Sequence, residues 1–151
     1  MPLRTPRHGN SERPAVRPAR APRAVALVIR VLLLFVRVEL GLRLSSLQRL
    51  CRELGIATTP PVEPSVGARP FPRDFARAAI AAVDRVGRWW PWGDTCLRRC
   101  LVLGRLLTAA DPVLVLGVTR SADGAFGAHS WLEFGGETFD PQARDFARLP
   151  W

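Results

Sequence analysis

Apolar residues dominate residues 24–40 and are interrupted at Arg30 and Arg37, which lie seven positions apart. Residues at this spacing share one face of a helix, so the two arginines form a narrow polar stripe on an otherwise apolar surface. The pattern predicts a mostly buried core helix that breaks at Gly41. The alternative is that its apolar surface docks on a membrane or on a partner protein.

A second amphipathic pattern is marked by four leucines: Leu44, Leu47, Leu50 and Leu54. Ser45 or Ser46 is suited to cap this helix, and Gly55 is suited to end it. Cys51 lies on the apolar stripe, which predicts a small core residue rather than a reactive thiol.

Residues 56–70 are rich in proline and have no periodicity, so they predict a connecting loop. Asp74 is suited to cap a third helix that ends at Gly87. The inward face of this helix is predicted to carry Phe75, Ala79, Val83 and Val86. The tryptophans of residues 89–93 form an aromatic loop, which either lines a substrate groove or packs above the helix.

A fourth helix is predicted from Cys96 to about Ala110, with Asp94 or Thr95 as its N-cap. Residues 111–112, an Asp-Pro pair, would stop it. The positions expected to pack inward are Leu97, Leu101, Gly104 and Leu107 or Thr108.

The last third of the chain has the pattern of strands. Residues 113–119 are continuously apolar and predict a buried strand, and residues 121–127 predict a polar loop. Residues 128–134 and 137–140 flank a Gly-Gly pair, which is suited to a two-residue hairpin turn because both positions tolerate positive φ.

These patterns predict an α+β domain in which four helices precede a small antiparallel sheet. At 151 residues the chain is long enough to bury one core. We divide it into a disordered basic tail over residues 1–23, a helical part with a proline-rich loop over residues 24–70, and a core over residues 71–151. The second and third parts form one domain.

The net charge of +9 comes from arginine alone, since the chain has no lysine. Residues 1–23 hold six arginines and one glutamate and account for +5 of this charge. The rest is spread over the chain, so no single basic patch indicates nucleic acid, and a solvated basic tail is the preferred interpretation. Loose attraction to acidic partners or to a membrane surface stays open.

Three cysteines, an odd number, do not form the framework of a secreted disulfide protein. Arg30 divides the apolar run of residues 25–36, and no small-residue cleavage site follows it, which argues against a signal peptide. Arg30, Arg37 and Glu39 also argue against a membrane span, which needs about 20 mostly uncharged apolar residues. We therefore expect a reducing, cytoplasmic location.

Cys96 and Cys100 differ in their place on the fourth helix. Cys96 lies in the first turn, where unpaired N–H groups and the helix dipole favour a thiolate, so it is the candidate nucleophile. Cys100 lies one turn further along, where this effect has faded, and we interpret it as a buried, inert cysteine.

His129 and Asp140 are the candidate base and orienting carboxylate for that nucleophile. If the Gly-Gly pair forms a two-residue turn, Trp131 faces Asp140, and His129 faces Gln142. Asp140 is then the diagonal neighbour of His129, with backbones roughly 7–8 Å apart, a gap that the side chains can close. Glu133, four residues along the same strand, would be too far away.

A zinc site built from Cys96, Cys100 and His129 is a weaker alternative, because a fourth ligand is missing. The sequence has no phosphate-binding glycine loop and no dinucleotide fingerprint. No metal and no cofactor are therefore expected.

Residues 91–103 (PWGDTCLRRCLVL), 116–118 (LGV) and 128–133 (AHSWLE) together resemble the transglutaminase-like leader peptidases of lasso-peptide biosynthesis. The resemblance covers roughly the last 60 residues closely. It implies a minimal papain/transglutaminase-like core with Cys96 as nucleophile, His129 as base and Asp140 as orienter. Cys100 departs from the family pattern, since relatives usually carry Ser or Ala there.

The resemblance also implies a substrate and partners. The substrate would be the leader of a ribosomally made precursor peptide. A small leader-binding protein and an ATP-using, asparagine-synthetase-like lasso cyclase would act beside the peptidase. Some relatives carry the leader-binding module at their N-terminus; residues 1–23 are too short for it, so we expect a separate partner.

Two rival functions use the same residues differently. A transglutaminase-like acyltransferase would use the same triad with an amine in place of water, and only the mass of the product separates it from a peptidase. A non-catalytic peptide-binding scaffold would be indifferent to Cys96→Ala.

Overall fold

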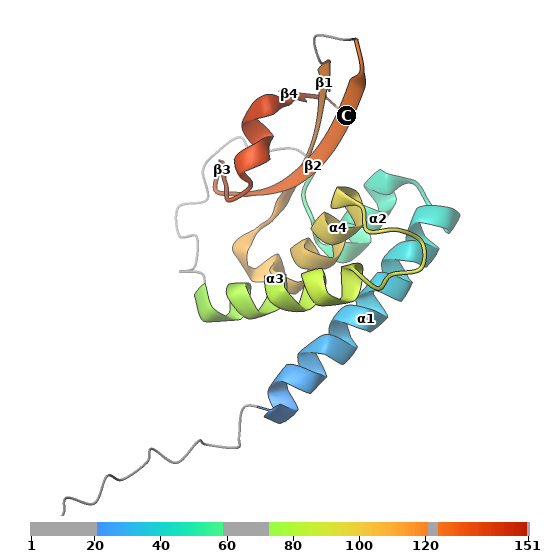
Figure 1. The fold of residues 1–151 in the computed structure, drawn as a ribbon, viewed down its shortest axis with the longest axis vertical. Coiled ribbons are helices and arrows are strands. Elements are labelled where there is room, and N and C mark those ends of the chain that lie inside the picture. Colours follow the sequence, from blue (N-terminus) through green and yellow to red (C-terminus); the bar gives the residue numbers. More distant parts are fainter. Residues whose placement is uncertain (1–20, 59–72, 121–123, 151) are drawn as a thin grey trace, which may run out of the picture.

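The computed structural model describes residues 21–58, 73–120 and 124–150. Within them, four helices precede a small antiparallel sheet, which confirms the predicted α+β class (Figure 1). The helices are α1 (Ala21–Leu44), α2 (Leu47–Leu54), α3 (Arg73–Gly87) and α4 (Cys96–Leu106). Residues 1–20 of the predicted tail and residues 59–70 of the predicted proline-rich loop lie outside the described residues.

Helix α1 is longer than predicted, because it begins at Ala21 and continues through Gly41 to Leu44. A Cβ at position 41 would lie 2.4 Å from Leu50 Cδ1 of α2. Gly41 therefore allows α1 and α2 to approach closely. The packing of the two helices outweighs the cost of a glycine inside a helix, which is about 1 kcal/mol relative to alanine. The expectation of a mostly buried helix was wrong: Val31, Phe35 and Val38 are fully buried, but another face of α1 is exposed.

Helix α2 has the predicted caps. The Ser46 side chain accepts a hydrogen bond from Arg49 N, and Gly55 ends the helix in the left-handed conformation with φ 70°. Leu50, Cys51 and Leu54 are buried as predicted, whereas Leu44 belongs to the end of α1 and is 81% exposed. Cys51 is thus a core residue.

Helix α3 ends at Gly87 as predicted, but Asp74 lies inside its first turn rather than at a cap. Ala79, Val83 and Val86 are buried, while Phe75 is 39% exposed. Phe75 lies in the first turn of α3, before the part of the helix that packs in the core.

Helix α4 begins at Cys96 and is four residues shorter than predicted, because it ends at Leu106. A short 3-10 helix, η2 (Thr108–Ala110), replaces its expected last turn, and Asp111 then takes a positive φ of 49°. Pro112 follows directly and explains why no further helical turn forms.

The sheet has the strand order β3-β2-β1-β4, with β1 (Val113–Arg120), β2 (Phe126–Phe134), β3 (Glu137–Thr138) and β4 (Ala147–Arg148). Strand β2 begins at Phe126, two residues earlier than predicted. Residues 121–123 of the predicted loop lie outside the described residues. The sequence did not predict β4. A short 3-10 helix, η3 (Pro141–Asp145), connects β3 to β4.

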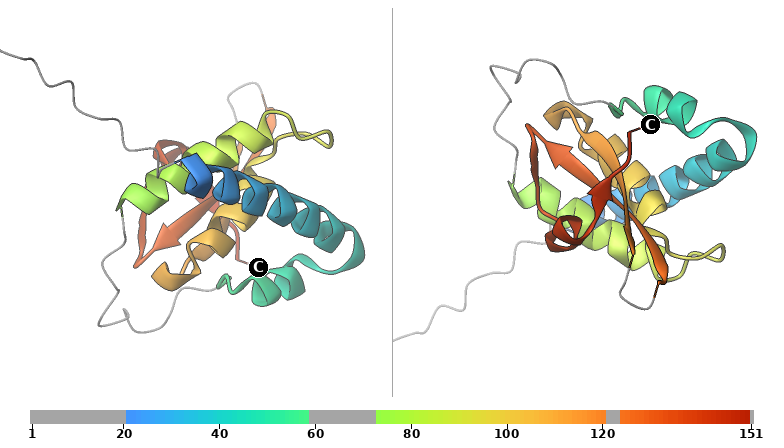
Figure 2. Two further views of the ribbon diagram at one scale, coloured as in Figure 1. Left: turned by 90° about the horizontal axis from the view of Figure 1, so that it is seen from below. Right: turned by 90° about the horizontal axis from the view of Figure 1, so that it is seen from above.

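The helices lie on one face of the sheet, with α4 packed against β2 and also against α1 and α3 (Figures 1 and 2). Leu114 and Leu132 join the helical core on this face. On the other face, Val115 and Trp131 pack with Ala143 and the half-buried Phe146. Cys96 therefore begins a helix that contacts β2, the strand that carries His129.

Candidate functional site

Cys96 is the first residue of α4, as predicted. Thr95 caps the helix, and its side-chain oxygen accepts a hydrogen bond of 3.3 Å from Arg98 N. Cys96 is half-buried at this helix end, where the first backbone N–H groups have no partner within the helix. This is the setting in which a helix end stabilises negative charge on sulfur.

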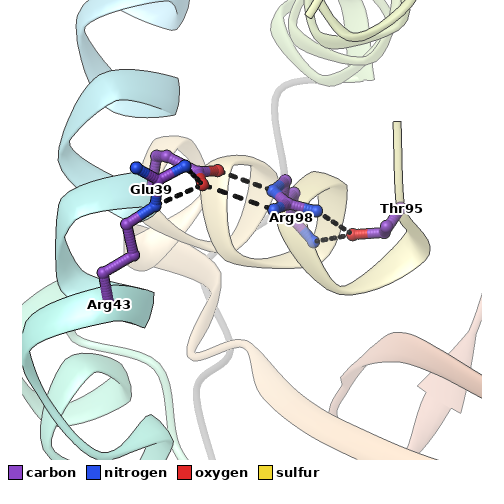
Figure 3. A network of polar contacts seen from close by, with 4 residues as sticks. All are labelled: Glu39, Arg43, Thr95 and Arg98. Atoms are coloured by element: carbon purple, nitrogen blue, oxygen red, sulfur yellow. Dashed lines mark hydrogen bonds and ion pairs between the residues drawn. The ribbon is translucent and has the colours of Figure 1, made fainter. Parts of the chain in front are cut away.

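An arginine of the same turn ties α4 to α1 (Figure 3). Arg98 Nε donates to Glu39 Oε2 over 2.8 Å, and the Arg98 guanidinium also donates to Thr95 Oγ1 over 3.3 Å. Glu39 is only 5% exposed and also accepts from Arg43 Nε over 3.0 Å. The hydrogen bond from Arg98 holds the pKa of the Glu39 carboxyl below its usual range, although burial acts in the opposite direction.

The neighbouring Arg99 ties the same turn to α3. It donates to Asp84 Oδ1 over 3.1 Å and pairs with Asp94 of the preceding loop. The hydrogen bond with Asp94 raises the pKa of the Arg99 guanidinium. A Cβ on Gly87 would lie 2.7 Å from Asp94 Oδ1, so the glycine leaves room for this carboxylate.

The side chains of His129 and Asp140 form a hydrogen bond, as the sequence predicted. His129 Nε2 lies 2.8 Å from Asp140 Oδ2. A carboxylate at this distance holds the proton on Nε2 and leaves Nδ1 free to accept another. Asp140 is itself held, because its Oδ1 accepts from Gln142 N over 2.9 Å and caps η3.

The register behind this prediction is correct at the turn and wrong beyond it. Phe134 pairs with Glu137 and Glu133 with Thr138, and both turn glycines have positive φ. Strand β3 ends at Thr138, however, so the expected pairings of Asp140 and Gln142 with β2 do not form. Pro141 lacks a backbone N–H and begins η3 there, which turns the chain out of the sheet.

Aromatic rings flank the imidazole of His129. Its ring centroid lies 6.1 Å from that of Trp131 and 5.1 Å from that of Phe146. Gly117 of β1 pairs with His129 across the sheet. A Cβ on Gly117 would lie 2.7 Å from Trp131 Cζ3 and 2.8 Å from Phe146 Cβ, so the absence of a side chain there makes room for both rings.

Glu133 has a different role from Asp140. It is 3% exposed, accepts from Trp131 Nε1 over 3.1 Å and pairs with Arg148 of β4. Among the described residues, no hydrogen bond joins Glu133 to His129, which agrees with the prediction from the spacing along β2.

Cys100 is held against β2 by its thiol, which donates to the carbonyl oxygen of Ser130 over 3.3 Å. Burial raises the pKa of Cys100 to about 12, and burial likewise raises the pKa of Cys51 to about 11. Both thiols therefore stay protonated at neutral pH, in agreement with their predicted inert character.

A cavity of about 770 Å³ brings the predicted residues together, since Cys96, Cys100, His129 and Asp140 all line it. Its other walls include apolar side chains of α3, α4 and β2. Among the described residues, no hydrogen bond joins the Cys96 thiol to His129. A smaller hollow of about 310 Å³ between α1 and α2 contains none of the predicted site residues.

The tryptophan loop does not line this cavity, so its interpretation as a substrate groove finds no support. Trp90 is 9% exposed and packs against Phe35 with ring centroids 5.0 Å apart, which is the core-packing alternative. Trp89 and Trp92 point outward and are 86% and 50% exposed.

The zinc alternative also finds no support. Over the described ranges, no group of three or more His, Cys, Asp and Glu side chains could hold a metal ion. Cys100 donates its thiol proton to a carbonyl, whereas a zinc ligand would be a thiolate.

Comparison with known families identifies the class of protein. The family model of the transglutaminase-like superfamily matches residues 32–149, and the chain belongs to this superfamily. No significant match was found among curated proteins or among solved structures. The match includes Cys96, His129 and Asp140 and begins inside α1.

Sequence reasoning did not find the contacts that hold these residues in place. The Glu39–Arg98 pair joins positions 59 residues apart. One signal existed: Glu39 is the only acidic residue of α1, and a carboxylate within such an apolar helix requires a partner. Nothing in the spacing identified that partner as Arg98.

Proposed function

We propose that the protein is a cysteine peptidase that removes the leader from a ribosomally made lasso-peptide precursor. The observation that carries the proposal is the 2.8 Å contact of His129 Nε2 with Asp140 in a cavity that Cys96 also lines. Membership of the transglutaminase-like superfamily supports chemistry through an acylated cysteine.

The proposed reaction begins when a precursor peptide occupies the cavity. His129 Nδ1 takes the thiol proton, and Cys96 Sγ attacks the carbonyl carbon of the scissile peptide bond. The carbon–nitrogen bond then breaks, and the imidazolium gives its proton to the departing amine. Water, deprotonated by His129, attacks the thioester and releases the leader as a carboxylic acid, which regenerates the Cys96 thiol.

Each residue of the proposed site has a part in this reaction. Asp140 keeps the imidazole in the tautomer with the proton on Nε2 and stabilises the imidazolium. In this proposal the backbone N–H of Cys96, at the start of α4, stabilises the oxyanion of the tetrahedral intermediate. The rings of Trp131 and Phe146 restrict the orientation of the imidazole.

The proposal includes two partners and a location. A separate leader-binding protein delivers the precursor, and an ATP-using, asparagine-synthetase-like cyclase closes the ring after cleavage. Both would work with the peptidase in the cytoplasm. In the described residues, no helix is long and apolar enough to cross a membrane.

Acyl transfer to an amine is the second candidate, because the superfamily to which the chain belongs is named for that reaction. The same thioester forms in both reactions, and only the acceptor differs. Cleavage with water adds 18 Da in total to the two products, whereas transfer leaves one product joined to the amine.

The test combines the chain with the precursor peptide and the leader-binding protein that the proposal expects to be encoded beside its gene. We expect mass spectrometry to find free leader acid and core peptide with the wild type and neither with Cys96→Ala. An amine adduct in place of leader acid would favour the acyltransferase. Equal product from Cys96→Ala, or the lack of a precursor gene nearby, would contradict the proposal.

A further inference from the structure

One face of α1 carries a row of exposed apolar side chains. Its members follow one another at intervals of three or four positions, apart from the adjacent Leu32 and Leu33, so they lie on one side of the helix. They are between 43% and 63% exposed: Val25, Ile29, Leu32, Leu33, Val36 and Leu40. We call this row the α1 apolar stripe. It is distinct from the buried face that contains Val31 and Phe35.

The exposed charges of α1 all have the same sign. Arg23, Arg30 and Arg37 are exposed, and α1 contains no acidic residue other than Glu39. Glu39 is 5% exposed and is neutralised by Arg98 and Arg43. The exposed side of α1 therefore presents a long apolar stripe with positive charge beside it.

An exposed tryptophan lies at the C-terminal end of the stripe. The guanidinium of Arg43, three positions after Leu40, lies 5.1 Å from the centroid of the Trp92 ring, which is 50% exposed. Trp89 of the same loop is 86% exposed. Tryptophan is enriched where an apolar phase meets water, because its ring is apolar and its N–H is polar.

We propose that α1 docks on an anionic membrane surface, with the α1 apolar stripe among the acyl chains and the arginines at the phosphate headgroups. This is the arrangement of an amphipathic helix that lies in the interface. A second copy of the chain fits the stripe less well, because it would bring arginines of two α1 helices together. The inference is independent of the proposed peptidase activity.

Vesicle flotation of the full chain tests the proposal. We expect the wild type to float with vesicles that contain phosphatidylcholine and phosphatidylglycerol, and not with phosphatidylcholine alone. Replacing Arg30 or Arg37 by glutamine should weaken binding about fivefold for each arginine. Binding should also fall as salt is added.

A pair of matched variants tests the apolar part. Leu33→Asp, at a position 63% exposed on α1, should weaken binding to the anionic vesicles by at least about tenfold. Phe126→Asp is the control, because Phe126 is 69% exposed on β2 and lies outside the stripe. It should bind as the wild type does. Circular dichroism checks that both variants are folded.

Several outcomes would overturn the proposal. Failure of the wild type to float, or equal flotation with phosphatidylcholine alone, would exclude an anionic membrane as the occupant. If Leu33→Asp binds the anionic vesicles as tightly as the wild type, binding depends on charge alone, to which the arginines before Ala21 also contribute, and not on the α1 apolar stripe. A dimer in sedimentation equilibrium that Leu33→Asp abolishes would identify a second copy as the occupant, and capture of an acidic protein without vesicle binding would identify a protein partner.

Discussion

Glu39 of α1 and Arg98 of α4 are joined by a hydrogen bond of 2.8 Å between Oε2 and Nε. Arg98 lies in the same helical turn as Cys96 and also contacts the capping Thr95. The Glu39–Arg98 pair therefore ties the helical turn that carries Cys96 to α1, a helix that does not line the cavity at Cys96.

The first prediction concerns this pair. Glu39→Gln should lower the free energy of unfolding by about 1.5–3 kcal/mol, because a hydrogen bond between charged groups is lost and the partly buried charge of Arg98 keeps no carboxylate at this position. Urea denaturation measures the change. The control is Glu53→Gln, which breaks the exposed pair with Arg49 and should cost about 0–1 kcal/mol. Equal costs would contradict a special role of the buried pair.

The second prediction concerns acid stability. The folded pKa of Glu39 is lowered below its ordinary value of 4.5, so the unfolded chain binds this proton first as the pH falls. The stabilisation is complete above about pH 4.5 and is lost as the pH falls through the folded pKa. Wild type and Glu39→Gln should therefore differ in unfolding free energy at pH 7 and converge toward acid pH. A difference that is constant with pH would be inconsistent with this linkage.

The third prediction separates the cysteines. Iodoacetamide at pH 8 should alkylate Cys96 in the folded protein, because it is half-buried at a helix start. Cys100, whose pKa is raised to about 12, is a thiolate in only about one molecule in 10⁴ at that pH. Cys51 should also resist. Peptide mapping by mass spectrometry locates the label, and urea should make all three thiols reactive. Preferential labelling of Cys100 in the folded state would contradict the assignment.

The activity of cysteine variants gives the matching functional test. Cys96→Ala should abolish leader cleavage, whereas Cys100→Ser should leave most of it, since serine can still donate to the Ser130 carbonyl. Comparable losses in two folded variants would indicate that the thiols act as a pair.

The fourth prediction concerns the orienter. Asp140→Asn should slow cleavage by about 10- to 1,000-fold, less than the ~10⁴ found when a serine site loses its carboxylate, because a thiol ionises more easily. His129→Ala should erase cleavage. Single-turnover rates distinguish these effects from changes in binding.

Glu133→Gln is the control for Asp140→Asn. Glutamine keeps an oxygen that can accept from Trp131 Nε1, so chemistry should be nearly unchanged even if the lost pair with Arg148 lowers stability. Loss of cleavage in Glu133→Gln together with unchanged cleavage in Asp140→Asn would show that Glu133, and not Asp140, is the orienting residue.

The fifth prediction concerns delivery of the substrate. The isolated protein should cleave its precursor poorly at low concentration and faster when the leader-binding protein is added, because a tethered leader raises the effective concentration of the scissile bond. The dependence of initial rate on partner concentration measures this. Full-rate cleavage without the partner would contradict the expected division of labour.

Local signals in the sequence predicted much of the site. The Thr95 cap, the first-turn position of Cys96 and the Gly-Gly turn all depend on a few neighbouring residues, and the structure has them as predicted. The His129–Asp140 contact was also predicted, but from a strand pairing that forms only next to the turn. Asp140 reaches the imidazole from the start of η3 and not from a paired strand.

Contacts between distant segments were not predictable in the same way. Gly41 was expected to end a helix, because sequence shows its low propensity but not the Leu50 side chain that passes over it. The space that Gly117 leaves for Trp131 and Phe146 is likewise a property of three separate segments. Such residues owe their identity to packing, which a linear pattern does not contain.

Arg98 and Arg99 are adjacent in sequence, yet one holds α1 through Glu39 and the other holds α3 through Asp84. We therefore expect that the cysteine-bearing helix and the sheet do not keep their arrangement as a smaller unit without α1 and α3. A fragment that begins after Leu44 would keep Cys96, His129 and Asp140, but Arg98 would lose Glu39 and the core that α1 covers would be exposed. Transfer of the proposed site to another scaffold would have to carry α1 along, even though α1 contributes none of the proposed catalytic residues.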